Sequence, residues 1–458
     1  MMTDPIQNSK RNHLLNKVLF LLAFTACYFV CRIPLIHEPL FFEEGIFAEL
    51  MVHQPVGPHY NMYGRIDGQN VYGRMSHPAG PYEVLRLAGK LGHVILADPL
   101  YLYDDIITPR LRILSVLISW CAWMTIALWG CLVAKNRWAC LVIAVAGISP
   151  LAMKTSTALQ IDNTAGVLIC GISAALIYQA FRCSAKGWLR YCLYAGAGCI
   201  GGLGKQEWSI ALLAAIAAGL LFVRRQHREV SVRDELHFGF SIVAGLLLGN
   251  AISFIYDPEN YVSAFYVMKG LSRFSANATG NLLDSLKCRI PFLVSYCLLA
   301  MLMGLYMFSG RAKSFSDRTL FFYGIFLCLP FLASQSYELR YFAPALVVIT
   351  VGCMGSIPFV VSFRQRVAIL AVVGLILMAS GVFLYGYTPD RNVHLEMIQQ
   401  GTLKSEPGTL LFVNSGAGWN KPHIDYIGDT IGIQSAYKVA ERNGKKLVIP
   451  PSPNQSGQ

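Results

Sequence analysis

The stretch that decides the fold is residues 14–36, LLNKVLFLLAFTACYFVCRIPLI, the first apolar run long enough to cross a bilayer. A transmembrane helix needs about 20 predominantly apolar residues. Comparable runs recur along almost the whole chain, and we place eleven of them. They lie near residues 14–36, 109–133, 138–153, 162–181, 189–204, 207–223, 237–255, 290–309, 319–333, 341–361 and 367–387.

Composition supports a membrane protein. Apolar residues make up 54% of the chain and charged residues 14%, and the mean hydropathy is +0.46. A soluble domain carries roughly 25% charged residues. The sequence therefore predicts an all-α polytopic membrane protein. The net charge of +12 is explained by topology and by anionic lipid, with no need for nucleic acid.

Lysine and arginine orient the predicted spans, because basic residues concentrate in cytoplasmic loops. The basic clusters alternate with short loops that hold single cations, Lys154, Lys205 and Arg340. We therefore expect a multi-pass inner-membrane protein with a cytoplasmic N-terminus, and with loops 37–108 and 256–288 and the tail 388–458 outside. The basic clusters are Lys10/Arg11/Lys17, Lys135/Arg137, Arg182/Lys186/Arg190, Arg224/Arg225/Arg228/Arg233, Arg311/Lys313/Arg318 and Arg364/Arg366.

Two domains are expected. Residues 1–387 form the transmembrane domain, and its first outer loop holds two short interfacial helices, at 41–51 and 81–96, separated by a segment that glycines break repeatedly. Residues 388–458 are expected to form a small outer α/β appendage. It contains a strand-like run at 409–414, a helix-like segment at 429–442 and a second strand, KLVIP.

The first outer loop contains an unusual density of ionisable residues, FFEEGIFAELMVHQPVGPHYNMYGRIDGQNVYGRMSHP from Phe41 to Pro78. Glu43 and Glu44 are adjacent at its start. They could cap an interfacial helix at its positive end. One acid suffices for a cap, however, and two neighbouring carboxylates raise one pKa, which suits a general base.

Single cations in the short outer loops are candidate anion binders. Arg340 stands at the entrance to a span, where its fixed guanidinium would match phosphate oxygens in pairs. Lys205 lies in a tight turn between two spans, and snorkelling to the interface explains it about as well. His77 is equally suited to a loop hydrogen bond. Asp162, at the mouth of a span, is favoured as a pairing partner over a catalyst.

Four short motifs resemble the GT-C glycosyltransferases, in the same order along the chain. Residues 42–49, FEEGIFAE, are similar to the D-E-x-x-Y-A-E segment after the first span of aminoarabinose-lipid A transferases and protein O-mannosyltransferases. Residues 76–78, SHP, resemble the K/H-P-P segment, although the second proline is Ala79 here. Residues 202–205, GLGK, resemble a G-L-x-x-x-x-K turn, and residues 338–344, ELRYFAP, resemble an R-Y-x-L-P entrance. The resemblance covers the membrane domain and not the tail.

The resemblance implies an inverting enzyme that takes a sugar from a polyprenyl-phosphate carrier at the outer membrane face. Glu43 occupies the position of the family's catalytic aspartate with Glu44 beside it, and either could be the base. The acceptor would be a glycan, lipid or protein hydroxyl. No cofactor is expected, and no metal, because no DxD-like acidic pair is visible. Lys205, Arg340, Arg74 and His77 would bind the donor phosphate, and Tyr341, Asp162, Tyr261 and Arg273 the substrate.

Two other function classes fit a protein of this kind. A surface-polysaccharide ligase or polymerase would also use outer Arg and His residues, usually from a large late loop. A transporter should show charged residues or broken helices at mid-span in paired positions. The sequence instead gathers its polar residues at one face and shows no internal repeat. We therefore favour the glycosyltransferase.

Overall fold

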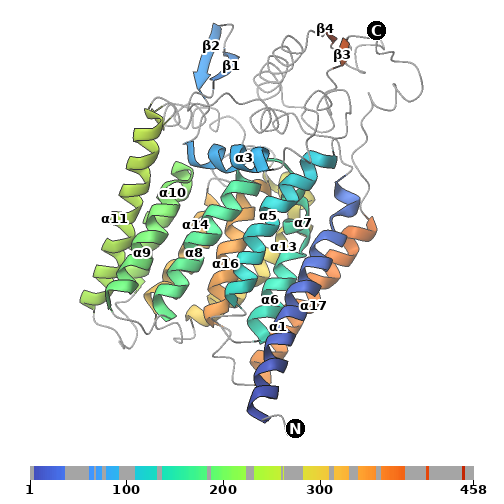
Figure 1. Ribbon diagram of the computed structural model, residues 1–458, viewed down its shortest axis with the longest axis vertical. Helices are drawn as coiled ribbons and strands as arrows, with labels where there is room; N and C mark the ends of the chain where they lie inside the picture. The colour runs from blue at the N-terminus through green and yellow to red at the C-terminus, as the bar shows by residue number, and fades with distance from the viewer. Residues whose placement is uncertain are drawn as a thin grey trace.

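The structure, a computed structural model, describes fifteen segments of the chain (Figure 1). This part of the protein is nearly all helical. The described residues are 5–36, 61–66, 69–74, 79–91, 109–130, 137–182, 187–222, 232–258, 261–262, 282–308, 314–329, 339–356, 363–386, 409–411 and 446–448.

A described helix occupies each of the eleven apolar ranges predicted from the sequence. Within the segments that the structure describes, five helical segments are long and apolar enough to cross a membrane, and a bent pair is a sixth if it forms one span. An all-α membrane protein is therefore confirmed, whereas the number of eleven spans stays a prediction. The helices are α1 (Pro5–Val30), α3 (Ala79–Leu91), α5 (Pro109–Trp129), α6 (Arg137–Gly147), α7 (Pro150–Thr157), α8 (Val167–Arg182), α9 (Gly187–Gly202), α10 (Gln206–Leu221), α11 (Val232–Tyr256), α13 (Leu282–Phe308), α14 (Phe315–Phe326), α16 (Phe342–Ser356) and α17 (Phe363–Gly386), with short turns η1 (Ile33–Leu35), η3 (Asp162–Gly166) and η6 (Leu339–Tyr341).

The predicted span at 138–153 is occupied by two helices that together are apolar enough for one span but are bent at a break. Helices α6 and α7 are bent by 51° relative to each other. Pro150 is the first residue of α7, and it has no backbone N–H with which to continue the hydrogen bonds of α6. The Ser149 side chain accepts a hydrogen bond from the Ala152 N–H instead, so that α7 begins as a new, capped helix.

The first outer loop contains one helix that the sequence predicted and one hairpin that it did not. Helix α3 lies across one end of the bundle (Figure 1), and the structure describes it as far as Leu91. Strands β1 (Asn61–Ile66) and β2 (Gln69–Arg74) pair antiparallel where repeated breaks were expected. Only Asp67 and Gly68 separate them in sequence, and Asp-Gly is a preferred two-residue hairpin connection. The predicted helix at 41–51 lies outside the described residues.

The tail contributes two short strands at the places predicted. Strand β3 (Thr409–Leu411) pairs parallel with β4 (Lys446–Val448). A parallel pair needs a long crossover between its strands, which agrees with an α/β unit. The helix-like segment 429–442 lies outside the described residues, so the appendage as a separate domain stays a prediction.

Helices α9 and α11 touch along their backbones. Gly198 and Gly202 of α9 face Gly245 and Gly249 of α11, each pair spaced four residues apart. A Cβ added at any of the four would overlap or crowd a backbone atom of the facing helix. Small residues at this spacing allow such close approach in membrane helices. The pair therefore has no room for a larger side chain at these positions.

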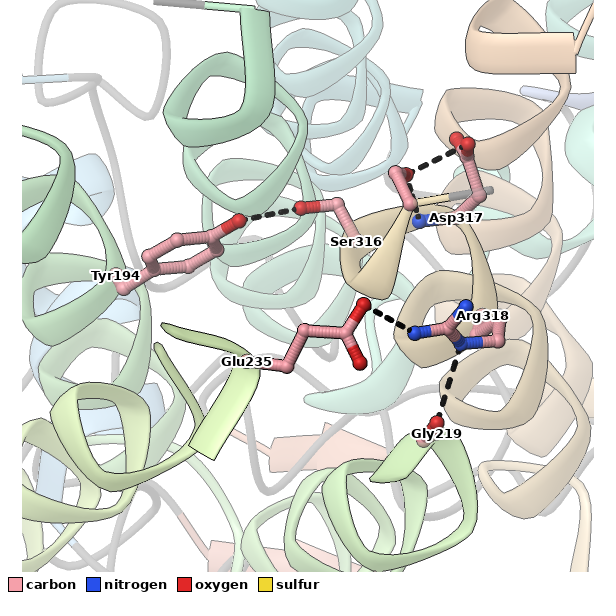
Figure 2. Close-up of polar contacts among 7 residues, drawn as sticks. Tyr194, Gly219, Glu235, Ser316, Asp317 and Arg318 are labelled. Carbon is pink, nitrogen blue, oxygen red and sulfur yellow. Dashed lines mark hydrogen bonds and ion pairs between the residues drawn. The ribbon is translucent and has the colours of Figure 1, made fainter. Parts of the chain in front are cut away.

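Buried polar contacts link helices α9, α10 and α11 to the start of α14 (Figure 2). Arg318 pairs with Glu235 of α11 at 2.7 Å and donates from Nε to the Gly219 carbonyl of α10 at 3.1 Å. Tyr194 of α9 and Ser316 share a 2.8 Å hydrogen bond. From the sequence, Arg318 served only as one of the basic residues that orient the spans in the membrane. In the structure its side chain links helices α10, α11 and α14.

Replacing Glu235 with leucine should lower the free energy of unfolding by about 3–5 kcal/mol, because Arg318 would lose the carboxylate that pairs with it in a buried setting. The measurement is thermal unfolding of the detergent-solubilised protein. Asp234→Leu removes the same charge from the neighbouring half-buried position and should change the melting temperature much less. Equal shifts for the two variants would contradict a buried ion pair at Glu235.

Candidate active site

Three charged side chains from three different elements meet at the end of the bundle that α3 covers. Lys205 Nζ lies 2.7 Å from Asp162 Oδ2. Arg340 Nε lies 3.9 Å from the same oxygen. The Lys205 and Asp162 side chains are 6% and 3% exposed, and that of Arg340 is 17% exposed. We call Asp162, Lys205 and Arg340 the charged triad.

Local backbone features place each member of the triad at the end of a helix. Asp162 opens the π-helical turn η3 ahead of α8, and such turns inside helices are frequent at functional sites. Lys205 is the residue before α10, in an extended conformation, and its side chain reaches Asp162 rather than capping the helix. Arg340 sits in the 3-10 turn η6 that leads directly into α16.

Lys205 remains charged in its buried setting. Burial disfavours the ammonium form of Lys205, but the carboxylates of Asp162 and Glu207 outweigh this effect, so the pKa of Lys205 is raised. Two cations around one carboxylate leave one net positive charge among these three side chains. An environment of this kind favours a monoanion that can accept hydrogen bonds from both cations.

Aromatic rings border the triad. The Trp208 ring lies 5.8 Å from Lys205 Nζ, and the Tyr341 ring lies 5.4 Å from the Arg340 guanidinium carbon. A Cβ at Gly204 would lie 2.5 Å from the Trp208 ring, so a glycine is required beneath it. Cation–π contacts at these distances help to hold cations that have lost their water.

A chain of hydrogen bonds joins the turn at Lys205 to the segment after α11. Gln206 Nε2 donates to the Tyr261 carbonyl at 3.0 Å, and the Tyr261 hydroxyl donates to Asn250 Oδ1 at 2.8 Å. Burial raises the pKa of the Tyr261 phenol, so it remains a neutral donor. The start of the loop 256–288 is therefore tied to the residue beside Lys205.

One buried acceptor next to the triad has no hydrogen-bond donor. Asn163 is 2% exposed, and its Nδ2 donates to Gln160 Oε1 at 3.0 Å. Within the described residues, its Oδ1 has no hydrogen-bond partner. Leaving a buried polar atom unpaired costs about 1–3 kcal/mol, so such an atom in a native structure calls for an explanation, and a catalytic role is one of those known.

The last part of the first outer loop, helix α3, packs against the turn that holds Lys205. Gly80, in the first turn of α3, packs so closely on the Leu203 carbonyl that an added Cβ would overlap it. Leu203 lies two residues before Lys205. Farther along α3, Glu83 Oε1 accepts a 3.0 Å hydrogen bond from the Tyr256 hydroxyl of α11. Helix α3 therefore bridges the Lys205 turn and the end of α11.

The structure brings together part of the site predicted from sequence. Lys205, Arg340 and Asp162 form the triad, and Tyr341 and Tyr261 lie beside it through the contacts given above. Arg74 belongs to strand β2, of which the structure describes only the backbone. The remaining predicted residues, Glu43, Glu44, His77 and Arg273, lie outside the described residues.

Sequence reasoning missed three polar residues at the site, Gln206, Asn250 and Asn163. Each is an uncharged amide at or near the end of an apolar helix, and amides there resemble ordinary helix-terminal residues. Asn250 offers the strongest signal, because it interrupts the apolar run of α11 six residues before the predicted loop 256–288. Within the segments that the structure describes, no three His, Cys, Asp or Glu side chains gather closely enough to hold a metal ion.

Comparisons with known proteins assign no family. No protein-family model matches the chain, and no curated protein matches it. Its structure is similar to the apo crystal structure of the Archaeoglobus fulgidus oligosaccharyltransferase, with 12% sequence identity and a TM-score of 0.41. The match covers 97% of this chain and 65% of that protein, so the chain spans less than two thirds of its length. At this identity and TM-score the likeness does not assign an activity.

Proposed function

We propose that this protein is an inverting glycosyltransferase of the membrane. It moves a sugar from a polyprenyl-phosphate carrier to an acceptor hydroxyl at the outer face. The observation that carries the proposal is the convergence of Lys205 and Arg340 on Asp162, buried at the end of the bundle that α3 covers. Charges buried at helix ends in a membrane protein are costly to maintain and usually serve function.

The charge of the triad suits the donor. A sugar linked to a polyprenyl phosphate is a phosphodiester with one negative charge, and the triad carries one net positive charge. When the bond between the anomeric carbon and the phosphate oxygen breaks, the phosphate gains a second charge. Lys205 and Arg340 stabilise that charge with donors already in place, in a setting where water competes little. We expect Arg74 and His77 to add to this stabilisation.

A carboxylate in the first outer loop completes the reaction. Glu43 or Glu44 takes the proton from the acceptor hydroxyl as its oxygen attacks the anomeric carbon from the face opposite the phosphate. One C–O bond forms as the other breaks, and because the attack comes from the face opposite the leaving phosphate, the configuration at that carbon inverts. The contact of Gly80 with Leu203 supports this arrangement, since it attaches the end of that loop to the Lys205 turn.

The hydrogen bonds of Tyr261 suggest how the donor is enclosed. Tyr261 opens the loop 256–288 and is held by Gln206, the residue after Lys205. Closure of this loop over the lipid-linked sugar would exclude water from the reacting carbon and would bring Arg273 towards the sugar. Asn163 Oδ1, which has no donor in the described structure, could accept a hydrogen bond from a sugar hydroxyl.

One observation favours a transporter as the second candidate. Transporters bind solutes at broken helices with buried charges, and α6 and α7 form a broken helix beside buried Arg32. Among the described helices only this pair is bent in this way, whereas a transporter built from repeats should show a second. We therefore rank transfer of sugar above transport.

Exchanging Glu43 and Glu44 for glutamine tests the base directly. We expect the double variant to lose about 10²–10⁴-fold in the rate of transfer, the usual contribution of a positioned general base. The measurement is transfer of radiolabelled sugar from polyprenyl-phosphate donors by purified protein in lipid. The two single variants show which glutamate acts. Transfer by the double variant at the wild-type rate would eliminate both as the base.

A further inference from the structure

Arg32 is a buried cation with several hydrogen bonds from its guanidinium. It lies after α1 and is 1% exposed. Its Nε donates to Ser156 Oγ at 2.6 Å, Nη1 donates to the Tyr28 carbonyl at 2.7 Å, and Nη2 donates to the Gly147 and Ala152 carbonyls at 2.8 and 3.1 Å. The guanidinium also stacks 3.3 Å from the Tyr28 ring centroid.

These partners define what Arg32 joins. Gly147 is the last residue of α6, and Ala152 and Ser156 belong to α7. One side chain therefore bridges the end of α1 and both sides of the break between α6 and α7. No carboxylate is among its partners in the described structure. The bonds consume four of the five N–H groups of the guanidinium, which leaves Arg32 poorly equipped to bind a ligand.

A second set of contacts continues from α7 to the charged triad. Arg112 Nη1 donates to the Thr157 carbonyl at 2.8 Å, and the Ser115 hydroxyl is bonded to the Ser156 and Ala158 carbonyls at 2.9 and 3.0 Å. The terminal carbonyls of α7 are thus held by α5. Asp162 follows four residues after Ala158, so this bonded end of α7 lies close in sequence to the triad.

The same arginine also fixes the start of the first outer loop. Residues 33–36 continue from Arg32 into the turn η1, where the Leu35 and Ile36 N–H groups donate to the Arg32 carbonyl at 2.9 and 3.2 Å. The chain leaves the described part at Ile36. Arg32 therefore contacts two segments that lie about 120 residues apart in sequence. One is the start of the first outer loop, and the other is helix α7, which precedes Asp162.

We propose that Arg32 is a positioning residue for sugar transfer, because it keeps the start of the first outer loop aligned with the triad. The proposal rests on the proposed function. It predicts a specific kinetic signature. Binding of the donor phosphate depends on Lys205 and Arg340, which Arg32 does not touch, whereas the reaction needs the loop and the triad to be aligned. Loss of the Arg32 hydrogen bonds should therefore lower kcat and leave KM for the donor nearly unchanged.

The test compares Arg32→Lys, Ser156→Ala and the double variant in purified, lipid-reconstituted protein. Lysine keeps the charge but cannot place donors on all the partners of the guanidinium. We expect Arg32→Lys to lower kcat by about 10–100-fold, since a misplacement of about 1 Å can cost 10²-fold, with KM within twofold of wild type. Ser156→Ala should lower kcat less. Because the two residues act through one contact, Ser156→Ala should add nothing in the Arg32→Lys background.

Ser380→Ala is the matched control, because Ser380 is also buried and, among the described residues, its hydroxyl bonds within its own helix, to the Ile376 carbonyl at 2.8 Å. Its kcat should equal that of wild type. Thermal unfolding, and binding of unglycosylated polyprenyl phosphate, are measured on every variant. The proposal is overturned if kcat falls only in proportion to the folded fraction, if binding of polyprenyl phosphate weakens as much as kcat falls, or if Arg32→Lys transfers at the wild-type rate. Failure of the proposed function looks different, since the wild-type protein would then neither transfer sugar nor bind polyprenyl phosphate.

Discussion

Replacing Lys205 with methionine should lower the rate of sugar transfer by about 10²–10³-fold, the loss typical when one preorganised group that stabilises developing charge is removed. Lys205 is the closest cation to the shared Asp162 oxygen, at 2.7 Å. Methionine has a similar length and no charge, so the leaving phosphate would lose its nearest stabilising group. The measurement is kcat with a polyprenyl-phosphate sugar donor in reconstituted membranes.

Two controls separate chemistry from stability in this experiment. Lys205→Met leaves Asp162 buried beside an uncharged side chain, and that imbalance destabilises the fold. Combining it with Asp162→Asn neutralises both partners and should recover most of the melting temperature without recovering transfer. Lys90→Met, on the exposed end of α3, should transfer at the wild-type rate. Recovery of activity in the double variant would contradict a direct role for the Lys205 charge.

The second large effect is expected at the contact of α9 with α11. Gly245→Leu would drive a side chain into the backbone of Ala195 and Cys199, and the flanking helix cannot yield as a side chain can. Overpacking in ordinary cores costs about 1–3 kcal/mol, and a backbone collision should exceed this. We expect little or no monodisperse protein, measured by gel filtration of the detergent extract.

Gly374 of α17 provides the control for this substitution, because nothing lies within 4 Å of a Cβ placed there. Gly374→Leu should elute and melt like wild type. If Gly245→Leu behaves as Gly374→Leu does, the backbone contact between α9 and α11 is wrong. Because Gly249 and Asn250 lie on the same helix, this contact also fixes the height at which Asn250 meets Tyr261.

The helical architecture could be predicted from sequence because each apolar run carries its own signal. A run of about 20 apolar residues predicts a helix without knowledge of its neighbours. The break between α6 and α7 was missed although Pro150 marks it, because apolar residues continue on both sides. The hairpin at β1 and β2 was missed because glycines in its strands suggested irregular backbone, whereas the Asp67-Gly68 dipeptide between them is the informative feature.

Part of the site could also be predicted, because charged residues at the ends of apolar runs are visible in a single sequence. Charge alternation placed Lys205 and Arg340 at the same face, and Asp162 was favoured as a pairing partner; the structure brings all three together. Arg32 and Asn163 were not singled out. Their roles depend on contacts with Gly147, Ala152 and Ser156, or on the absence of a donor, and neither is visible in a single sequence. The assignments of Glu43, Glu44, His77 and Arg273 stay predictions.

The central claim is that the triad stabilises a lipid phosphate as a sugar leaves it. The most direct measurement follows both products when purified wild-type protein is reconstituted with polyprenyl-phosphate sugars and candidate acceptors. The account predicts glycosylated acceptor of inverted anomeric configuration and free polyprenyl phosphate in equal amounts, with both reduced together in Lys205→Met. Release of no polyprenyl phosphate by a folded wild-type protein, from either hexose- or pentose-bearing donors, would contradict it.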